Sequence, residues 1–138
     1  YTLVEKVLQQ AERGDPTHMV GDMVFSPSYA PHVARTMREL IDAEAFGTHH
    51  ITNAGACSWY DFVATAFAKA GLGSAPLERI TYASLGNATR RPMYSPLENT
   101  TFARYGLAPM PHWESALDEY LRLRAPRLTT TGVVRVAP

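Results

Sequence analysis

Residues 57–71 have the sequence CSWYDFVATAFAKAG, and this stretch carries the clearest helix signal in the chain. Ser58 stands where a helix N-cap belongs, and Asp61 follows three residues later, the spacing of a capping box with aspartate in its second place. Gly71 closes the pattern, as glycine often does after the last helical residue. Apolar residues recur at helical spacing and predict a buried face of Phe62, Val63, Ala66, Phe67 and Ala70. We therefore expect a core helix between Ser58 and Gly71.

Four further helices are predicted around this one. Thr2 and Glu5 have capping-box spacing, and the first helix ends at Gly14, Asp15 and Pro16. Its apolar stripe is Leu3, Val4, Val7, Leu8 and Ala11. A helix from Pro31 to Gly47 has a predicted buried face of Val33, Met37, Leu40 and Ile41. A short helix is expected from Ser95 to Gly106, because Ser95, Pro96 and Glu98 supply a cap, a first-turn proline and a box partner. The last helix runs from Pro111 to Arg124 and buries Trp113, Ala116, Leu117, Tyr120 and Leu121.

Three short strands are predicted between the helices. They lie at Met19–Phe25, Thr48–Thr52 and Leu77–Tyr82. Helices and strands that alternate in this way favour an α/β arrangement, here one in which helices dominate. Residues 126–138 are expected to be a tail, in which Val133–Val136 could pair as an edge strand.

Composition excludes several classes of protein. The chain has 138 residues, 46% of them hydrophobic and 19% charged, which is ordinary for a globular domain. Thirteen basic residues balance thirteen acidic ones, so we expect no nucleic-acid partner, which would require a basic surface. No apolar run approaches the ~20 residues of a membrane span, and no membrane partner is expected. The first residues lack both a signal sequence and an initiating Met, so we expect upstream residues to be missing. A single cysteine, Cys57, fits a reducing compartment, and we expect a cytoplasmic location.

The usual catalytic and cofactor motifs are absent from the sequence. It contains no dinucleotide-binding glycine fingerprint and no P-loop. A Tyr-xxx-Lys pair is also missing, because Thr2 and Thr65 precede the two lysines, Lys6 and Lys69, by four positions. We therefore expect no catalytic residue and no cofactor-binding residue in this chain.

Other chemically capable residues have a plainer interpretation. The adjacent histidines His49 and His50 would point to opposite faces of a strand, so no metal site is expected there. No motif links Cys57 to a histidine that would make it a nucleophile, although its position at the start of a helix could lower the pKa of its thiol. Asp118 and Glu119 are interpreted as surface charges. Trp59 and Trp113 are interpreted as core anchors rather than stacking platforms.

Two segments have the chemistry of recognition sites. Arg90-Arg91-Pro92 follows a strand and a polar loop, and a guanidinium there can hold a diphosphate through two parallel hydrogen bonds. Residues 26–29, Ser-Pro-Ser-Tyr, occupy a strand-to-helix junction, where α/β folds commonly present groups to a ligand. By themselves these spacings favour the plainer interpretations, a surface arginine and an ordinary turn.

Four motifs, taken in order, resemble those of dTDP-4-dehydrorhamnose reductases. Residues 21–34, GDMVFSPSYAPHVA, are similar to the family's D-Q-x-G-S-P-T-Y-x-x-D-L-A. Residues 47–51, GTHHI, and 57–62, CSWYDF, resemble G-x-Y-H-x and S-W-Y-E-F. Residues 91–99, RPMYSPLEN, resemble R-P-x-x-S-x-L-D-N, and residues 113–121 resemble the closing W-x-x-A-L-x-x-Y-L. The resemblance covers residues 1–124 and rests on the order and spacing of the motifs.

The resemblance implies a small, helix-rich α/β lobe with a few short strands, the carboxy-terminal substrate-binding part of an extended Rossmann-type reductase. In that family NADPH, or NADH, reduces dTDP-4-dehydro-L-rhamnose to dTDP-L-rhamnose, and a Mg ion is a further possible cofactor. The cofactor glycines and the catalytic Tyr-xxx-Lys lie upstream of the matched region, so this chain alone is expected to be inactive. Residues 1–125 would form the sugar-nucleotide-binding part, with 126–138 as the tail.

The resemblance also implies site residues and departures. Arg91 would contact the diphosphate of the dTDP-sugar, and Tyr29 and Ser26 would lie at the edge of the cleft. Met23 and Phe25 stand where the family has Gln and Gly, and His32 replaces an acidic residue, so the sugar is left open. A related sugar-nucleotide epimerase and a non-catalytic binding or regulatory module of the same ancestry are the alternatives.

A partner is expected on physical grounds. In this family the strand matching 48–52 extends the sheet of the cofactor domain, and the helix at 31–45 packs on that sheet. Without the upstream part, a sheet edge and an apolar face would be exposed. We therefore expect either a homo-oligomer or contact with the missing N-terminal domain.

Overall fold

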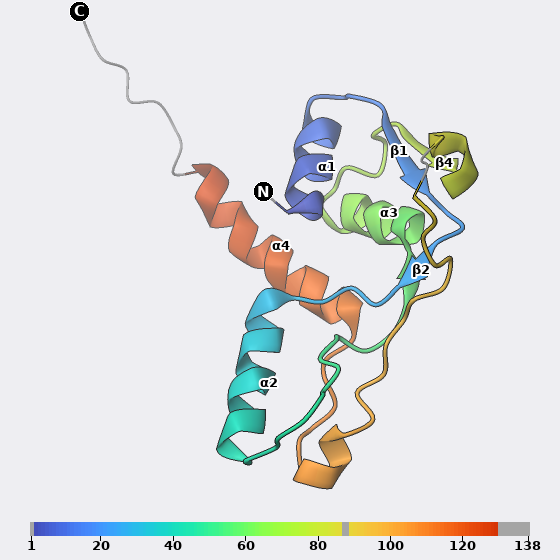
Figure 1. Cartoon of the computed structure of the whole chain (residues 1–138). Coiled ribbons are helices and arrows are strands. Elements are labelled where there is room, and N and C mark those ends of the chain that lie inside the picture. The colour runs from blue at the N-terminus through green and yellow to red at the C-terminus, as the bar shows by residue number, and fades with distance from the viewer. Residues whose placement is uncertain (1, 87–88, 130–138) are drawn as a thin grey trace, which may run out of the picture.

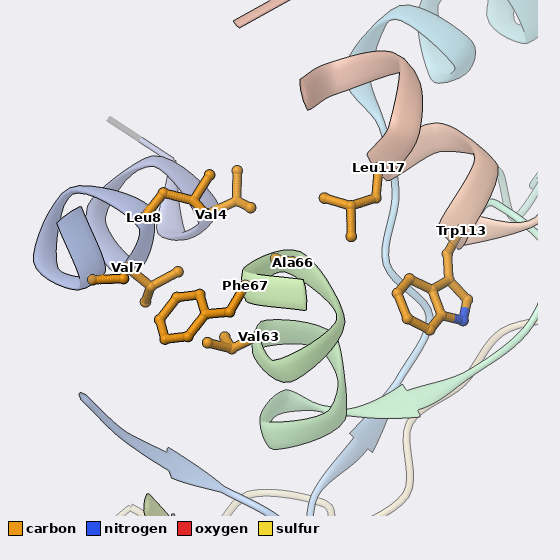
Figure 2. Packing of buried hydrophobic residues seen from close by; sticks show 9 residues of the cluster. Val4, Val7, Leu8, Val63, Ala66, Phe67, Trp113 and Leu117 are labelled. Atoms are coloured by element: carbon orange, nitrogen blue, oxygen red, sulfur yellow. The ribbon is translucent and has the colours of Figure 1, made fainter. Parts of the chain in front are cut away.

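The main core lies between three helices. The computed structural model describes residues 2–86 and 89–129 (Figure 1). Helix α3 (Trp59–Lys69) packs against α1 (Leu3–Glu12) and α4 (Trp113–Thr129). Their buried side chains form one cluster, shown in Figure 2: Val4, Val7, Leu8, Ala11, Val63, Ala66, Phe67, Trp113 and Leu117. The predicted apolar faces of the first and third helices are thus confirmed.

Capping explains where these helices begin. Ser58 Oγ accepts the backbone N–H of Asp61 at 3.0 Å and lies 2.6 Å from the Asp61 carboxylate, as the sequence predicts. Thr2 Oγ1 accepts the N–H of Glu5 at 3.4 Å, which confirms the predicted cap of α1. Only half of that capping box forms, because the Glu5 carboxylate binds Tyr120 and Arg124 instead.

Two small sheets accompany the helices. Strand β1 (Thr17–Val20) pairs in parallel with β4 (Leu77–Ile80), and β1 contacts both α1 and α3. Strand β2 (Val24–Phe25) pairs antiparallel with β3 (Cys57–Ser58), with Phe25 opposite Cys57. The segment predicted as one strand at Met19–Phe25 is therefore two. The chain turns between them, because Gly21 N–H donates to Ile80 at the end of β4 and Asp22 accepts from Tyr82 in the following 3₁₀ helix η1 (Tyr82–Leu85).

Helix α2 (Ala30–Asp42) belongs to a second, smaller cluster. Leu40 packs there with Phe102 of the 3₁₀ helix η2 (Phe102–Tyr105) and with Met110. Figure 1 shows α2 and η2 at the opposite end of the molecule from β1 and β4, with α4 running between the two regions.

The predicted buried face of α2 is wrong in part. His32, Thr36 and Leu40 are the buried residues, whereas Met37 and Ile41 are 50% and 72% exposed. Two of the buried residues are polar, and apolar periodicity could not identify them. Each has a partner from a distant segment: Thr36 contacts the sulfur of Met110 at 3.0 Å, and His32 contacts Glu119.

Two predicted elements do not form. Residues 48–52 lie in an extended segment without strand pairing to any described residue, and the N–H of Thr52 donates to the side chain of Asn99 instead. Residues 95–99 are extended rather than helical, because Ser95 N–H and Oγ both donate to Val24 of β2. Helix appears only at η2, which ends at Gly106 in the left-handed conformation.

Helix α4 is longer than predicted. It passes Pro126, where we expected the tail to begin, and continues to Thr129. A proline removes one backbone hydrogen bond from a helix but need not end it. The strand expected at Val133–Val136 lies outside the described residues. The helix-rich α/β class is confirmed.

Candidate functional site

A cavity of about 300 Å³ opens between α1, α3, α4 and the junction of β2 with α2. Elements far apart in the sequence meet there, so each contributes only two to five residues. Its lining consists of Thr2, Leu3, Val4, Phe25, Pro27, Ser28, Tyr29, Ala30, Trp59, Phe62, Trp113, Ala116, Leu117 and Tyr120.

Stacked aromatic rings form one wall of the cavity. The rings of Phe25 and Trp59 lie 3.8 Å apart at an angle of 11°, which is a stacked pair. Phe62 meets Phe25 edge-on at 5.9 Å, and its ring lies 5.7 Å from that of Trp113 at a tilt of 50°. The antiparallel pairing of β2 with β3 places Phe25 opposite Cys57. Because Trp59 follows Cys57 by two residues, this pairing brings the rings of Phe25 and Trp59 together. Such pairs stabilise one another beyond the area they bury, which makes this wall stiff.

Two tyrosines also line the cavity. The ring of Tyr29 meets that of Tyr120 edge-on at 6.5 Å. The hydroxyl of Tyr120 donates to Glu5 at 2.5 Å. Burial, together with this hydrogen bond to a carboxylate, raises the pKa of Tyr120 to about 12, so its hydroxyl keeps its proton. The cavity therefore offers a phenol as a polar group, but no phenolate.

A charged network lies behind Tyr120. Arg124 binds Glu5 at 3.1 Å and Glu12 at 2.8 Å, and its side chain is only 10% exposed. Hydrogen bonding from Arg124 is the main cause that lowers the pKa of Glu5. The two carboxylates neutralise the guanidinium, and none of the residues that line the cavity carries a formal charge. The cavity can therefore stack against and hydrogen-bond an uncharged ring, but its walls hold no cation for a phosphate.

The three residues predicted as substrate contacts lie in different settings. Tyr29 lines the cavity. Ser26 lies between two lining residues in the sequence, Phe25 and Pro27, but does not line the cavity itself. Its hydroxyl accepts the N–H of Leu97 at 3.2 Å. Arg91 is exposed and does not line the cavity. The bridge between Val24 and Tyr94 brings the segment after Arg91 alongside β2, so Ser26 and this segment are neighbours. The contacts of all three with a ligand stay predictions.

Sequence reasoning missed several residues of the site. Trp113 is buried in the core, as predicted, and it also lines the cavity, whereas Trp59 is only half-buried and stacks on Phe25 at the cavity. The sequence signal for this wall is limited to the aromatic residues Phe25 at the end of β2 and Trp59 directly after β3. Glu119 is not a plain surface charge, because its carboxylate lies 3.0 Å from the buried ring of His32. Asp118 is an exposed partner of Lys69.

Cys57 is chemically quiet. Burial, with the negative charges of Asp61 and Glu114, raises the pKa of its thiol to about 12. The thiolate, which is the nucleophilic form, is therefore scarce near neutral pH despite the position of Cys57 before α3.

Within residues 2–86 and 89–129, no three histidine, cysteine or acidic side chains are grouped closely enough to hold a metal ion. No helix in the same residues combines the length and apolarity that a bilayer crossing requires.

The glycine-rich turn that holds the pyrophosphate of a nicotinamide dinucleotide is absent from the sequence. The residues of this chain therefore supply no binding motif for that cofactor.

Comparisons with known proteins agree on one family. The chain is 36% identical over 122 residues to the spore coat polysaccharide biosynthesis protein SpsK of Bacillus subtilis, covering 88% of this chain and 42% of that protein. It superimposes on a dTDP-4-dehydrorhamnose reductase of Clostridium acetobutylicum with a TM-score of 0.84 and 28% identity, over 91% of this chain and 44% of the other. The same enzyme of Bacillus anthracis, in complex with NADP, gives a TM-score of 0.82 and 26% identity, over 90% and 43%.

This chain thus spans less than half the length of each of these relatives. A family model described as the RmlD substrate binding domain matches residues 2–125, nearly all of the chain that the structure describes. With the motif order, the helix-rich α/β fold and the similarity over 88% and 91% of this chain in agreement, the chain belongs to the RmlD substrate binding domain family.

Proposed function

We propose that this chain binds a dTDP-linked deoxysugar and that its cavity receives an uncharged ring of that ligand. The observation that carries the proposal is the cavity itself, which has a stacked aromatic wall, two tyrosines and no charged lining residue. Aromatic faces pack well against the C–H groups of a sugar or against a base, and a phenol supplies one polar contact. The names of the relatives from Clostridium acetobutylicum and Bacillus anthracis support a dTDP-4-dehydro sugar as the ligand class.

The diphosphate would then lie outside the cavity. Arg91 is exposed and forms no ion pair or hydrogen bond with another described residue, and arginine favours a bidentate pair with phosphate. Arg91 is proposed as the diphosphate contact, with Tyr29 and Ser26 at the edge of the ring site. This division explains why the cavity needs no cation.

In the whole enzyme the binding lobe would orient its ligand for reduction. Holding a keto carbon in reach of a hydride donor turns an encounter into an intramolecular step, which can supply several kcal/mol of the barrier. The proposed reaction is the NADPH-dependent reduction of dTDP-4-dehydro-L-rhamnose in the cytoplasm. This chain lacks the Tyr-xxx-Lys pair, so by itself it is proposed to bind the sugar nucleotide without reducing it.

Ligand binding can be tested by calorimetric titration of the chain with dTDP-L-rhamnose and with dTDP. Arg91→Ala is expected to weaken binding of both about tenfold or more, because charge-assisted hydrogen bonds to phosphate are lost. Trp59→Leu is expected to weaken binding of the ligand whose ring enters the cavity by about five- to tenfold, through loss of stacking. Trp59 fluorescence provides a second readout of the same event.

Arg90→Ala is the matched control, because Arg90 is the exposed neighbour of Arg91 and has no assigned role. Its affinities should equal those of the unaltered chain. A folded chain that binds neither compound would contradict the proposed function. Equal losses in the Arg90 and Arg91 variants would remove Arg91 from the site.

We also propose that a second copy of the chain covers the exposed face of α2. Met37 and Ile41 lie one turn apart on this helix, and Phe46, which follows it, is 86% exposed. The neighbouring residues 48–52 have no strand partner among the described residues, and the N–H and C=O of Thr52 are both bonded to Asn99. The apolar faces of two copies would therefore meet about a two-fold axis without strand pairing through Thr52.

Light scattering tests this self-association directly. The chain is expected to be a dimer or larger at micromolar concentration, and Ile41→Lys should shift it toward the monomer. Leu85→Lys is the control, because Leu85 is also an exposed apolar residue but lies on η1, away from α2 (Figure 1). A stable monomer, or equal effects of the two substitutions, would show that no second copy covers α2.

A further inference from the structure

We infer that Asn53 is a positioning residue that fixes Tyr29 at the cavity wall through a directed chain of buried hydrogen bonds. The inference about hydrogen bonding stands on the geometry alone. Its consequence for ligand binding rests on the proposed function.

Asn53 is completely enclosed, with 1% of its surface exposed, although it lies in a segment without regular structure. Its Oδ1 accepts the backbone N–H of Tyr29 at 2.8 Å. Its Nδ2 lies 2.9 Å from the carbonyl oxygen of Pro111 and 2.9 Å from Nδ1 of His32. His32 is 4% exposed, and its Nε2 lies 3.0 Å from the Glu119 carboxylate. All polar atoms of the Asn53 side chain are therefore engaged.

The backbone at both ends sets the direction of these bonds. The N–H of Tyr29 can only donate, so the atom of Asn53 that faces it must be the oxygen. The carbonyl of Pro111 can only accept, so the atom that faces it must be the amide nitrogen. That carbonyl is held in place, because it also accepts the N–H of Ala54 at 3.0 Å. The amide of Asn53 thus has one permitted orientation.

The orientation of Asn53 in turn selects one form of His32. The amide nitrogen presents a hydrogen to Nδ1 of His32, which must accept it and so carries no proton. The proton of the neutral ring is then on Nε2, where it is donated to Glu119. A proton on Nδ1 would place two donors face to face inside the protein. The chain of bonds therefore runs in one direction, from Tyr29 through Asn53 and His32 to α4.

This network lies directly behind the cavity wall. Tyr29 is the N-cap residue of α2, but its side chain makes no capping bond, so the backbone bond to Asn53 holds it. The Tyr29 ring lines the cavity and meets the ring of His32 edge-on at 5.0 Å. Glu119 belongs to α4 and directly precedes Tyr120, which lines the cavity. Asn53 and His32 therefore link Tyr29 to α4, the helix that carries Tyr120, without lining the cavity themselves.

The nitrogen signals of the His32 ring test the directed chain without any ligand. In the ¹⁵N-labelled chain near neutral pH, Nδ1 should resonate in the unprotonated range and Nε2 in the protonated range. Asn53→Asp keeps an acceptor for Tyr29 but replaces the donor to His32, so Nδ1 should become protonated between two carboxylates. An Nδ1 proton in the unaltered chain, or an unchanged ring in Asn53→Asp, would overturn the inference.

Amide exchange at Tyr29 tests the positioning. Asn53→Ala should accelerate exchange of the Tyr29 N–H about tenfold relative to the amides of α1 and α3, because its buried acceptor is gone. Thr36→Val is the control: Thr36 is another buried polar residue of α2, and it contacts Met110 rather than Tyr29. A merely structural role of Asn53 would speed exchange across α2 equally in both variants, and this result would contradict the inference.

Titration with dTDP-L-rhamnose then connects Asn53 to the site. Asn53→Ala should weaken binding about tenfold while Thr36→Val leaves it unchanged, because only the first releases Tyr29. Absence of binding by the unaltered chain would refute the proposed function and leave the His32 and Tyr29 results standing. Normal binding by a folded Asn53→Ala variant would instead refute positioning by Asn53.

Discussion

Phe67→Ala is expected to lower the free energy of unfolding by about 4 kcal/mol, a large share of the roughly 5–15 kcal/mol by which a domain is stable. Phe67 is 2% exposed, and Figure 2 shows its ring directed from α3 toward Val7 of α1. Removing the ring loses the free energy gained by burying it. It also leaves a cavity that the neighbouring helices can close only in part. Urea denaturation followed by far-ultraviolet circular dichroism at one protein concentration gives the difference.

Tyr94→Ala is the control for this loss. Tyr94 is also aromatic but is 74% exposed, so its replacement should change the free energy of unfolding by less than about 0.5 kcal/mol. A Phe67→Ala variant that unfolds at the same urea concentration as the unaltered chain would show that the α1–α3–α4 cluster is not the stabilising core.

Arg124→Met is expected to be the second most damaging change, with a loss of about 3 kcal/mol. Methionine keeps much of the apolar stem but removes the hydrogen bonds to Glu5 and Glu12, which connect α4 to α1. The Glu5 carboxylate is 21% exposed and would retain only part of its solvation. Because Glu5 also accepts from Tyr120, the damage should reach the cavity wall.

The same pair predicts how stability depends on pH. In the folded chain the pKa of Glu5 lies below its ordinary value of 4.5, chiefly because Arg124 donates to its carboxylate. Its contribution is therefore complete above about pH 4.5 and is lost as the pH falls through the lower, folded value. In Arg124→Met the free energy of unfolding should depend less on pH. Denaturation curves measured between about pH 3 and pH 6, where carboxylates titrate, show this difference.

Arg13→Met provides the comparison for the Arg124 variant. The Arg13–Asp15 pair is 2.8 Å long, but its side chains are 60% and 49% exposed, so its loss should cost less than about 0.5 kcal/mol. An equal cost for the two arginine substitutions, or an unchanged acid dependence in Arg124→Met, would contradict the role assigned to the Glu5–Arg124 pair.

The elements that could be predicted from sequence are those whose signals are local. Ser58 and Gly71 enclose α3, and Thr2 caps α1, because a cap and its helix are bonded within a few residues. Ser95 shows the limit of the same reasoning. It has the neighbours of an N-cap, yet its hydroxyl and amide bind Val24, 71 residues away, and no helix starts there.

The spacing of apolar residues predicted the buried face of a helix correctly only where apolar neighbours cover that face. For α1 the apolar stripe and the buried stripe coincide, because α3 lies on it. For α2 they differ, since His32 and Thr36 are buried by partners that the sequence does not place beside them, while Ile41 is exposed. A polar side chain is buried when a distant group satisfies it, and a periodicity of apolar residues contains no information about such groups.

For the candidate site, the sequence directed attention to the segment around Tyr29, which does line the cavity. It gave no indication that Trp59 and Phe25 stack, because the β2–β3 pairing brings them together across 34 residues of sequence separation, from 25 to 59. The network of Asn53, His32 and Glu119 was missed for the same reason. Each residue is ordinary by itself and acquires its role from the others.

The sequence by itself determined the family, the helix-rich α/β class and the two capped helices that build the core, because motif order, composition and caps are properties of residues close together in the chain. Only the tertiary structure decided which aromatic rings enclose a cavity, which face of α2 is buried and which way the proton of His32 points. These are fixed by contacts between segments far apart in sequence. Their energies depend on distance and direction in space, which no local pattern of residues encodes.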